Sequence, residues 1–197
     1  MKKLYIILAL ILAWLSALSA FASAERAVIE AAVLRLHVVA QSDSKEDQAI
    51  KLRVRDAVLK EFRHIACRVQ TKEEALLLAE QSEDTLLEAA RRTLKEEGVE
   101  YDVSLRIGTS AFPQKRYGDV VLPAGYYQSV IITLGEGKGH NWWCVMYPPL
   151  CTLAATEDIA DKGKRLLEDT LPKEAYRLIT DSEDTRVQIK LKILELF

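Results

Sequence analysis

Three cysteines and three histidines carry the side chains best suited to nucleophilic chemistry or disulfide formation: Cys67, Cys144, Cys151, His37, His64 and His140. Six residues lie between Cys144 and Cys151, and the Pro148-Pro149 pair among them can bend the chain so that the two sulfur atoms come within bonding reach. The sequence is equally compatible with two separate, small hydrophobic side chains. A Cys144–Cys151 disulfide is therefore one of two open interpretations, and Cys67 is expected to be a packed free thiol.

A cysteine nucleophile requires a base within hydrogen-bond distance and a group that orients this base. His140 is near Cys144 in the sequence, but none of the three histidines forms a recognisable local motif with it. A Cys-dependent hydrolase acting on cell-wall or peptide substrates is therefore the alternative function, and we assign no catalytic residues.

Metal and cofactor motifs are incomplete. His64 and Cys67 have the spacing of two zinc ligands on one helical turn, but a closed zinc site needs four ligands and the sequence offers no matching pair. The glycine-rich segment Gly135–Gly139 contains Lys138, but no Ser or Thr follows this lysine and no helix pattern comes after it, so a phosphate-binding loop is not expected. We expect no metal and no cofactor.

The pair Trp142-Trp143 stands in a strand pattern. Adjacent side chains of a strand point to opposite faces, so one tryptophan can lie in the core while the other faces solvent or a partner. Exposed tryptophans are common anchors of protein interfaces. We therefore name Asn141, Trp142 and Trp143 as candidate partner contacts; the alternative is that a helix covers the second face as well.

The first elements that would position these residues are a strand and two helices. Alternation over Val33–Ala40 predicts a strand with one buried face, and helical spacing over 45–66 predicts an amphipathic helix with an N-cap in the preceding polar cluster. Thr71 and Glu74 form a capping box for a second helix that ends near Gly98, with a possible break at Gln81–Asp84.

Further strands are predicted at 99–107, 126–134, 142–147 and 186–194, and a helix at 156–171. We interpret Gly135–Gly139 as a flexible hairpin connection between two of these strands. The order of elements lacks regular β-α-β alternation. The expected fold class is therefore α+β, with a mixed or antiparallel sheet packed against two or more helices and preceded by an N-terminal signal or anchor helix.

The N-terminal segment has the three parts of an export signal. Lys2 and Lys3 precede an uncharged apolar run from Leu4 to Phe21, and the small residues Ala22-Ser23-Ala24 follow it. We predict a signal peptide at 1–24, or an uncleaved anchor, and a single exported α+β domain at 25–197. Loss of residues 1–24 would remove two lysines and no acid, so the net charge of −2 would become −4, a balance unfavourable for nucleic-acid binding.

Four motifs together closely resemble the stage II sporulation protein R family. They are the segments Leu34–Gln48, Lys51–Leu59, Leu122–Tyr126 and Gly135–Cys151, and the most specific stretch is Asn-Trp-Trp-Cys-Val-Met-Tyr-Pro-Pro-Leu-Cys from Asn141 to Cys151. The resemblance covers residues 34–151, and the region after it offers no diagnostic motif.

The resemblance implies a sporulation signalling protein and not an enzyme. Such a protein is made in the forespore and exported into the intermembrane space. There it is required to activate a membrane-embedded aspartyl protease of the mother cell, which processes the sigma-E precursor. The implied partner is the extracytoplasmic, receptor part of that protease, and membrane contact would occur only through residues 4–21 if they are uncleaved. The family supplies no receptor-binding residues that could be transferred to this sequence.

Overall fold

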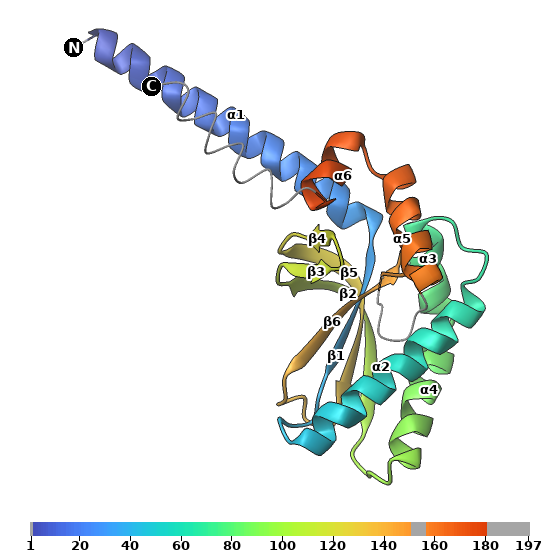
Figure 1. Cartoon of the computed structure of the whole chain (residues 1–197). Coiled ribbons are helices and arrows are strands. Elements are labelled where there is room, and N and C mark those ends of the chain that lie inside the picture. Colours follow the sequence, from blue (N-terminus) through green and yellow to red (C-terminus); the bar gives the residue numbers. More distant parts are fainter. Residues whose placement is uncertain (1, 151–156, 181–197) are drawn as a thin grey trace.

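The computed structural model describes residues 2–150 and 157–180 (Figure 1). Its helices are α1 (Lys2–Ala32), α2 (Lys45–Ile65), α3 (Lys72–Gln81), α4 (Glu83–Glu96), α5 (Glu157–Thr170) and α6 (Lys173–Thr180). Its strands are β1 (Leu34–Val39), β2 (Val103–Phe112), β3 (Lys115–Tyr117), β4 (Val120–Leu122), β5 (Gly125–Leu134) and β6 (Asn141–Tyr147).

The main sheet has four strands in the order β2-β5-β1-β6. Strand β1 is parallel to β5, whereas β1–β6 and β2–β5 are antiparallel pairs. Strands β3 and β4 form a separate two-stranded hairpin. The predicted α+β class with a mixed sheet packed against helices is therefore confirmed.

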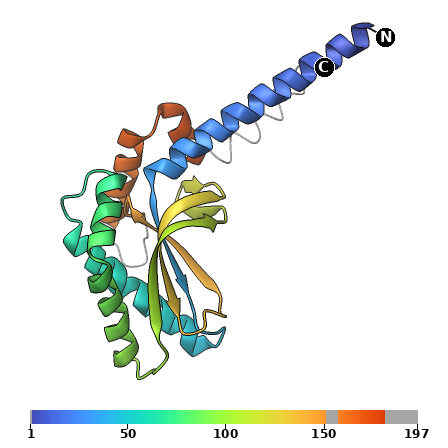
Figure 2. The same ribbon diagram turned by 180° about the vertical axis from the view of Figure 1, so that it is seen from behind.

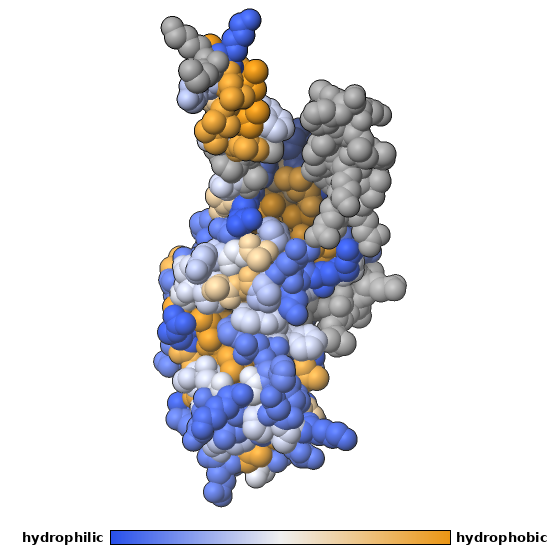
Figure 3. Space-filling model, turned by 90° about the vertical axis from the view of Figure 1, so that its left-hand side faces the viewer, coloured by the Kyte–Doolittle hydropathy of each residue, from blue (hydrophilic) through white to orange (hydrophobic). Residues whose placement is uncertain are grey.

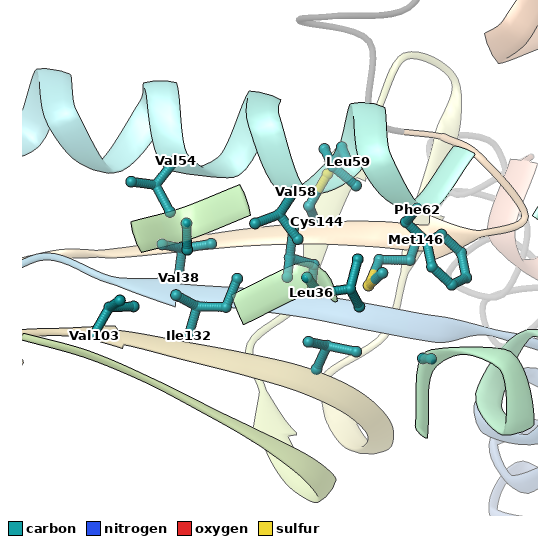
Figure 4. Close-up of a cluster of buried hydrophobic side chains, with 14 of the residues drawn as sticks. Leu36, Val38, Val54, Val58, Leu59, Phe62, Val103, Ile132, Cys144 and Met146 are labelled. Atoms are coloured by element: carbon teal, nitrogen blue, oxygen red, sulfur yellow. The ribbon is translucent and has the colours of Figure 1, made fainter. Parts of the chain in front are cut away.

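Helices α2, α3 and α4 cover one face of the sheet (Figures 1 and 2). Figure 4 shows the apolar stripe of α2, including Val54, Val58 and Phe62, packed over Leu36 and Cys144 of the two strands below it. Burial of this stripe explains why the amphipathic pattern of α2 forms a stable helix, since helices in proteins are stabilised mainly by such packing.

The opposite face of the sheet is covered at one end only. A second hydrophobic cluster lies there, formed by the end of α1, the β3–β4 hairpin, α5, α6 and parts of the sheet (Figure 1). Arg35 of β1 is fully buried beside this cluster. The expectation that β1 buries only one face is therefore wrong, because elements distant in the sequence cover the other face.

Helix α1 projects from the domain and ends in its core (Figure 1). Ile29 and Ala32 belong to the second cluster, and a Glu30 carboxylate oxygen accepts a hydrogen bond from the backbone N–H of Tyr126. Figure 3 shows hydrophobic surface on the projecting part. Within the described residues, no helix combines the length and hydropathy needed to cross a membrane. The predicted division at residue 24 stays a prediction.

Local capping signals in the sequence are realised in the structure. Ser44 is the N-cap of α2 and its hydroxyl accepts from the backbone N–H of Asp47, and Thr71 caps α3 in the same way through Glu74. The possible break between Gln81 and Asp84 is confirmed, because α3 ends at Gln81 and α4 begins at Glu83.

Some of the remaining elements were predicted and others were not. The helix predicted at 156–171 corresponds to α5, while α6 and the β3–β4 hairpin were not predicted. The strand expected at 186–194 lies outside the described residues, so it stays a prediction.

The segment from Gly135 to His140 is not a hairpin turn. It joins β5 to β6, but β1 lies between these two strands, so the segment must pass over the end of β1. The backbone N–H of Gly139 donates to the carbonyl oxygen of Ala40 at 2.9 Å, and that of Lys138 donates to Gln41 at 3.2 Å. We call this segment the crossover loop. The interpretation as a flexible hairpin is wrong, because the loop is held against the residues that follow β1.

The crossover loop leaves no room for a side chain at Gly139. A β-carbon there would overlap the backbone carbonyl of Ser42. We therefore expect Gly139→Ala to destabilise the protein by about 1–3 kcal/mol, the usual cost of overpacking, measured by urea unfolding. Gly108→Ala is the control, since the nearest atom to a β-carbon there is Arg106 Nη1 at 3.5 Å. Equal stability of the two variants would contradict a tightly packed crossover loop.

Candidate partner interface

A row of four side chains crosses the sheet at the border of the second cluster, with Trp143 packed against that cluster and Ile131 buried. Strand pairing places Arg106 of β2 beside Ile131 of β5, Ile131 beside His37 of β1, and His37 beside Trp143 of β6. We call these four residues the cross-strand row. Arg106 is exposed, while His37 and Trp143 are half-buried. Such a combination of an arginine and a tryptophan around an apolar centre is typical of protein interfaces.

Trp143 is fixed in place by aromatic neighbours. Its ring stacks on His37 with centroids 3.9 Å apart, and it meets the Phe112 ring edge to face at 4.9 Å. Asn141, also predicted as a partner contact, begins β6 on the same face and is exposed. The structure thus brings Asn141 and Trp143 together with His37 on one accessible face. Their role in binding a partner stays a prediction.

A buried cation supports the backbone of Trp143. The Arg35 guanidinium donates from Nη2 to the Tyr117 hydroxyl at 2.6 Å, and this hydroxyl donates to the Trp143 carbonyl oxygen at 3.1 Å. The guanidinium also lies 4.2 Å from the centre of the Phe112 ring. Burial lowers the pKa of Arg35, with the tyrosine hydroxyls opposing the shift. Among the described residues, no ion pair involving Arg35 is found, so aromatic rings and hydroxyl groups surround this charge.

Trp142 lies on the other face of β6, beneath α2. The Arg55 guanidinium of α2 stacks over its ring at 4.5 Å from the ring centre, and Trp142 packs against the first hydrophobic cluster. The two tryptophans thus lie on opposite faces of β6, as strand alternation predicts, and the role of either in binding a partner stays a prediction. Both rings are half-buried, one against α2 and the other at the border of the second cluster on the opposite face.

The electrostatics of the cross-strand row centre on His37. Burial lowers the pKa of its imidazole, a hydrogen bond to Asn141 opposes this shift, and the positive charge of Arg106 adds to it. His37 Nε2 is buried and has no hydrogen-bond partner within the described part of the chain. We therefore expect His37 to be neutral near pH 7.

The residues considered for cysteine chemistry are separated from one another. Cys144 is fully buried under α2 and is disulfide-bonded, whereas the side chain of His140 is 80% exposed and lies 2.5 Å from an Asp43 carboxylate oxygen. This hydrogen bond from His140 lowers the pKa of Asp43. Cys151 lies outside the described residues, so its pairing with Cys144 stays a prediction. Cys67 is free, as expected, but exposed and not packed.

The part of the chain that the structure describes contains no cluster of metal ligands. Over residues 2–150 and 157–180, no group of three or more His, Cys, Asp or Glu side chains lies close enough to hold an ion.

Sequence reasoning identified Trp143 but not the other three members of the cross-strand row. His37 and Ile131 fall in predicted strands, but nothing in the sequence placed them in one row with Trp143. Arg106 falls in a predicted strand, yet its position depends on the register between β2 and β5. That register brings together residues 25 positions apart and has no local signal.

The disulfide can be tested by alkylation. We expect the non-reduced protein to take up one alkyl group, at Cys67, and the reduced protein to take up three, as measured by intact mass. Uptake of two or three groups without reduction would rule out a Cys144–Cys151 bridge.

The lowered pKa of His37 predicts a pH-dependent stability. A histidine whose pKa is lower in the folded chain than in the unfolded chain binds fewer protons when folded, so stability rises with pH through that window. We therefore expect the free energy of unfolding to decrease as pH falls below about 6.5, the usual pKa of histidine. His37→Gln should flatten this dependence, and the exposed His64→Gln should not. A His37→Gln curve parallel to wild type would contradict the assignment.

Comparison with known proteins points to the same family that the four motifs resemble. The sequence model of the family described as "Stage II sporulation protein R (spore_II_R)" matches residues 30–157. The stage II sporulation protein R of Bacillus subtilis (strain 168) is 34% identical over 181 residues, which cover 85% of this chain and 81% of the relative. No solved structure matches the chain. The matched region contains β1, the crossover loop and β6. The chain belongs to the stage II sporulation protein R family.

Proposed function

We propose that this protein is an exported sporulation signal that acts as a ligand for a membrane-embedded aspartyl protease. It would be delivered from the forespore into the intermembrane space and would bind the extracytoplasmic part of the protease in the mother-cell membrane. The activated protease would then process the sigma-E precursor. Family membership supports the role in sporulation.

The observation that carries a binding role is the cross-strand row at the border of the second cluster, where Arg106 is exposed and His37 and Trp143 are half-buried. Its Trp143 ring is held rigidly by His37 and Phe112, so little conformational entropy would be lost when a partner covers it. Arg106 forms no ion pair with any described residue, which leaves its charge available to an acidic group of the partner. The net charge of −2 argues against a broad electrostatic attraction and favours such a local contact.

Activation by a ligand requires differential binding. A ligand shifts a receptor toward its active state only to the extent that it binds this state more tightly than the inactive one. A rigid face such as the cross-strand row can provide this preference if its complement is assembled only in the active arrangement of the protease.

The role in signalling is tested by deleting the gene. We expect the sigma-E precursor to remain unprocessed during sporulation while the protease is present at its normal level, as measured by immunoblotting of both proteins. Normal processing in the deletion strain would show that the proposal is wrong.

The interface is tested by variants of the cross-strand row in the full chain. Trp143→Ala and Arg106→Glu should each lower the rate of processing by more than about tenfold, because truncated interface anchors often cost 2 kcal/mol or more. Arg91→Glu, which makes the same charge change on the distant helix α4, should have no effect. Thermal unfolding checks that each variant is folded. Wild-type processing by both row variants would place the contact elsewhere.

A further inference from the structure

Strand β6 is an edge of the sheet, and its residues Asn141–Val145 pair with β1 in regular register and carry none of the usual protections of an edge. An irregularity in the register lies only beyond them, between Leu34 and Arg35 of β1. It pairs with β1 on one side, and Figures 1 and 2 show no described element beyond its lower part on the other side. Its seven residues, Asn141–Tyr147, include no charged residue and no proline. Natural proteins protect such edges with charges, prolines or bulges, because an open edge pairs readily with another strand. The opposite edge strand, β2, carries Arg106 in its middle.

Two buried hydrogen-bond donors lie on the α2 side of this edge without acceptors. Arg55 is only 3% exposed, and Asp56 binds its Nε at 2.8 Å and its Nη2 at 2.7 Å. Arg55 Nη1 and Trp142 Nε1 are buried and have no partner among the described residues. Buried donors are nearly always paired in folded proteins, so an acceptor is missing here.

The charges around Trp142 indicate the chemistry of this acceptor. Lys51 precedes Arg55 by one helical turn and is also buried, with its Nζ donating to the carbonyl oxygen of His140 at 2.9 Å. Two buried cations thus stand beside the start of β6, and each has a carboxylate nearby, since Asp56 binds Arg55 and Asp43 lies within electrostatic reach of Lys51. Neither carboxylate accepts a hydrogen bond from Arg55 Nη1 or Trp142 Nε1 among the described residues. A carboxylate fits this environment better than a neutral acceptor, because hydrogen bonds between charged groups are about twice as strong.

On the opposite face of β6, away from α2, lies Trp143 of the cross-strand row. The two tryptophans point to opposite faces of β6, so a strand added along this edge would have its alternating side chains against Trp142 on one face and Trp143 on the other. Added strands lie about 4.7–4.9 Å from their neighbour, which keeps their side chains within reach of both rings.

We propose that β6 receives an extended strand of the partner, and that an acidic side chain of this strand accepts hydrogen bonds from Arg55 and Trp142. The inference rests on the proposed function, since the partner is the extracytoplasmic part of the protease. Backbone hydrogen bonds along β6 supply affinity, and the two tryptophans with the buried arginine supply specificity.

Other occupants of the edge fit these charges less well. A second copy paired through its own β6 brings no Asp or Glu, since Asn141–Tyr147 has none, and would place two Arg55 cations near each other. The C-terminal stretch 186–194, predicted to be a strand, carries Lys190 and Lys192, which have the same sign of charge as Arg55.

The occupant can be identified by photo-crosslinking in the full chain. A photoreactive amino acid at Asn141, an exposed residue of β6, should crosslink to an acidic extracytoplasmic segment of the protease in co-expressing membranes, with the segment identified by mass spectrometry. The same group at Tyr126, which is 69% exposed on β5, serves as the control and should not crosslink to that segment. Crosslinks from Asn141 to a second copy or to residues 181–197 would overturn the proposal.

The missing acceptor is tested by Trp142→Phe, which keeps an aromatic ring but removes the Nε1–H donor. We expect processing of the sigma-E precursor to fall roughly tenfold, the effect of losing a hydrogen bond to a charged group. Thermal stability should not fall in parallel, because the lost donor has no partner in the free protein. Tyr126→Phe on β5, which likewise removes one hydrogen-bond donor from an aromatic side chain that is 69% exposed, is the control and should leave processing unchanged.

The outcomes separate the two proposals. If gene deletion leaves processing intact, the proposed function is wrong. If deletion blocks processing but Trp142→Phe is as active as wild type and Asn141 does not crosslink to the protease, only strand addition is wrong. A loss of activity that follows a loss of thermal stability would show a structural role for the Trp142 donor and would also overturn the inference.

Discussion

The position of β1 between β5 and β6 is the constraint on which the rest of the structure depends. Strands β5 and β6 follow each other in the sequence, and a short glycine-rich link between them would ordinarily form a hairpin. Because β1 occupies the space between them, the crossover loop must pass over the end of β1 and pack against the residues that lead into α2. Gly139 is therefore required by close backbone approach, and Gly135 and Gly137 by their left-handed backbone conformation, not by flexibility.

Because β1 is a central strand, its two faces contact two different hydrophobic clusters. Its even-numbered residues Leu34, Leu36 and Val38 face α2, while Arg35 and His37 face the other way. Arg35 is carried into the second cluster, where aromatic rings and the Tyr117 hydroxyl surround its charge. His37, two residues further along, reaches the part of that face where the second cluster ends. The transition from buried core to open surface thus occurs within one strand, and Trp143 lies at this transition.

Much of the local structure could be predicted from the sequence, but the arrangement of the sheet could not. Ser44 and Thr71 begin helices because their side chains accept hydrogen bonds from nearby backbone groups, which is a local interaction. The parallel pairing of β1 with β5 joins residues more than 90 positions apart, as in Arg35 with Ser129, and no short pattern encodes it. For this reason Asn141, Trp142 and Trp143 could be singled out, whereas their neighbours His37, Arg106 and Arg55 could not.

The strand order also limits when the protein can fold. Helices α2 to α4 form from contiguous sequence, but β1 has no hydrogen-bonded neighbour until β5 and β6 are available. A chain that ends before β5 would leave the apolar stripe of α2 without the sheet that covers it, and contacts between such distant residues form slowly. The four-stranded sheet therefore cannot be completed before residues up to Tyr147 are available, so its strand pairing is set late in the synthesis of the chain.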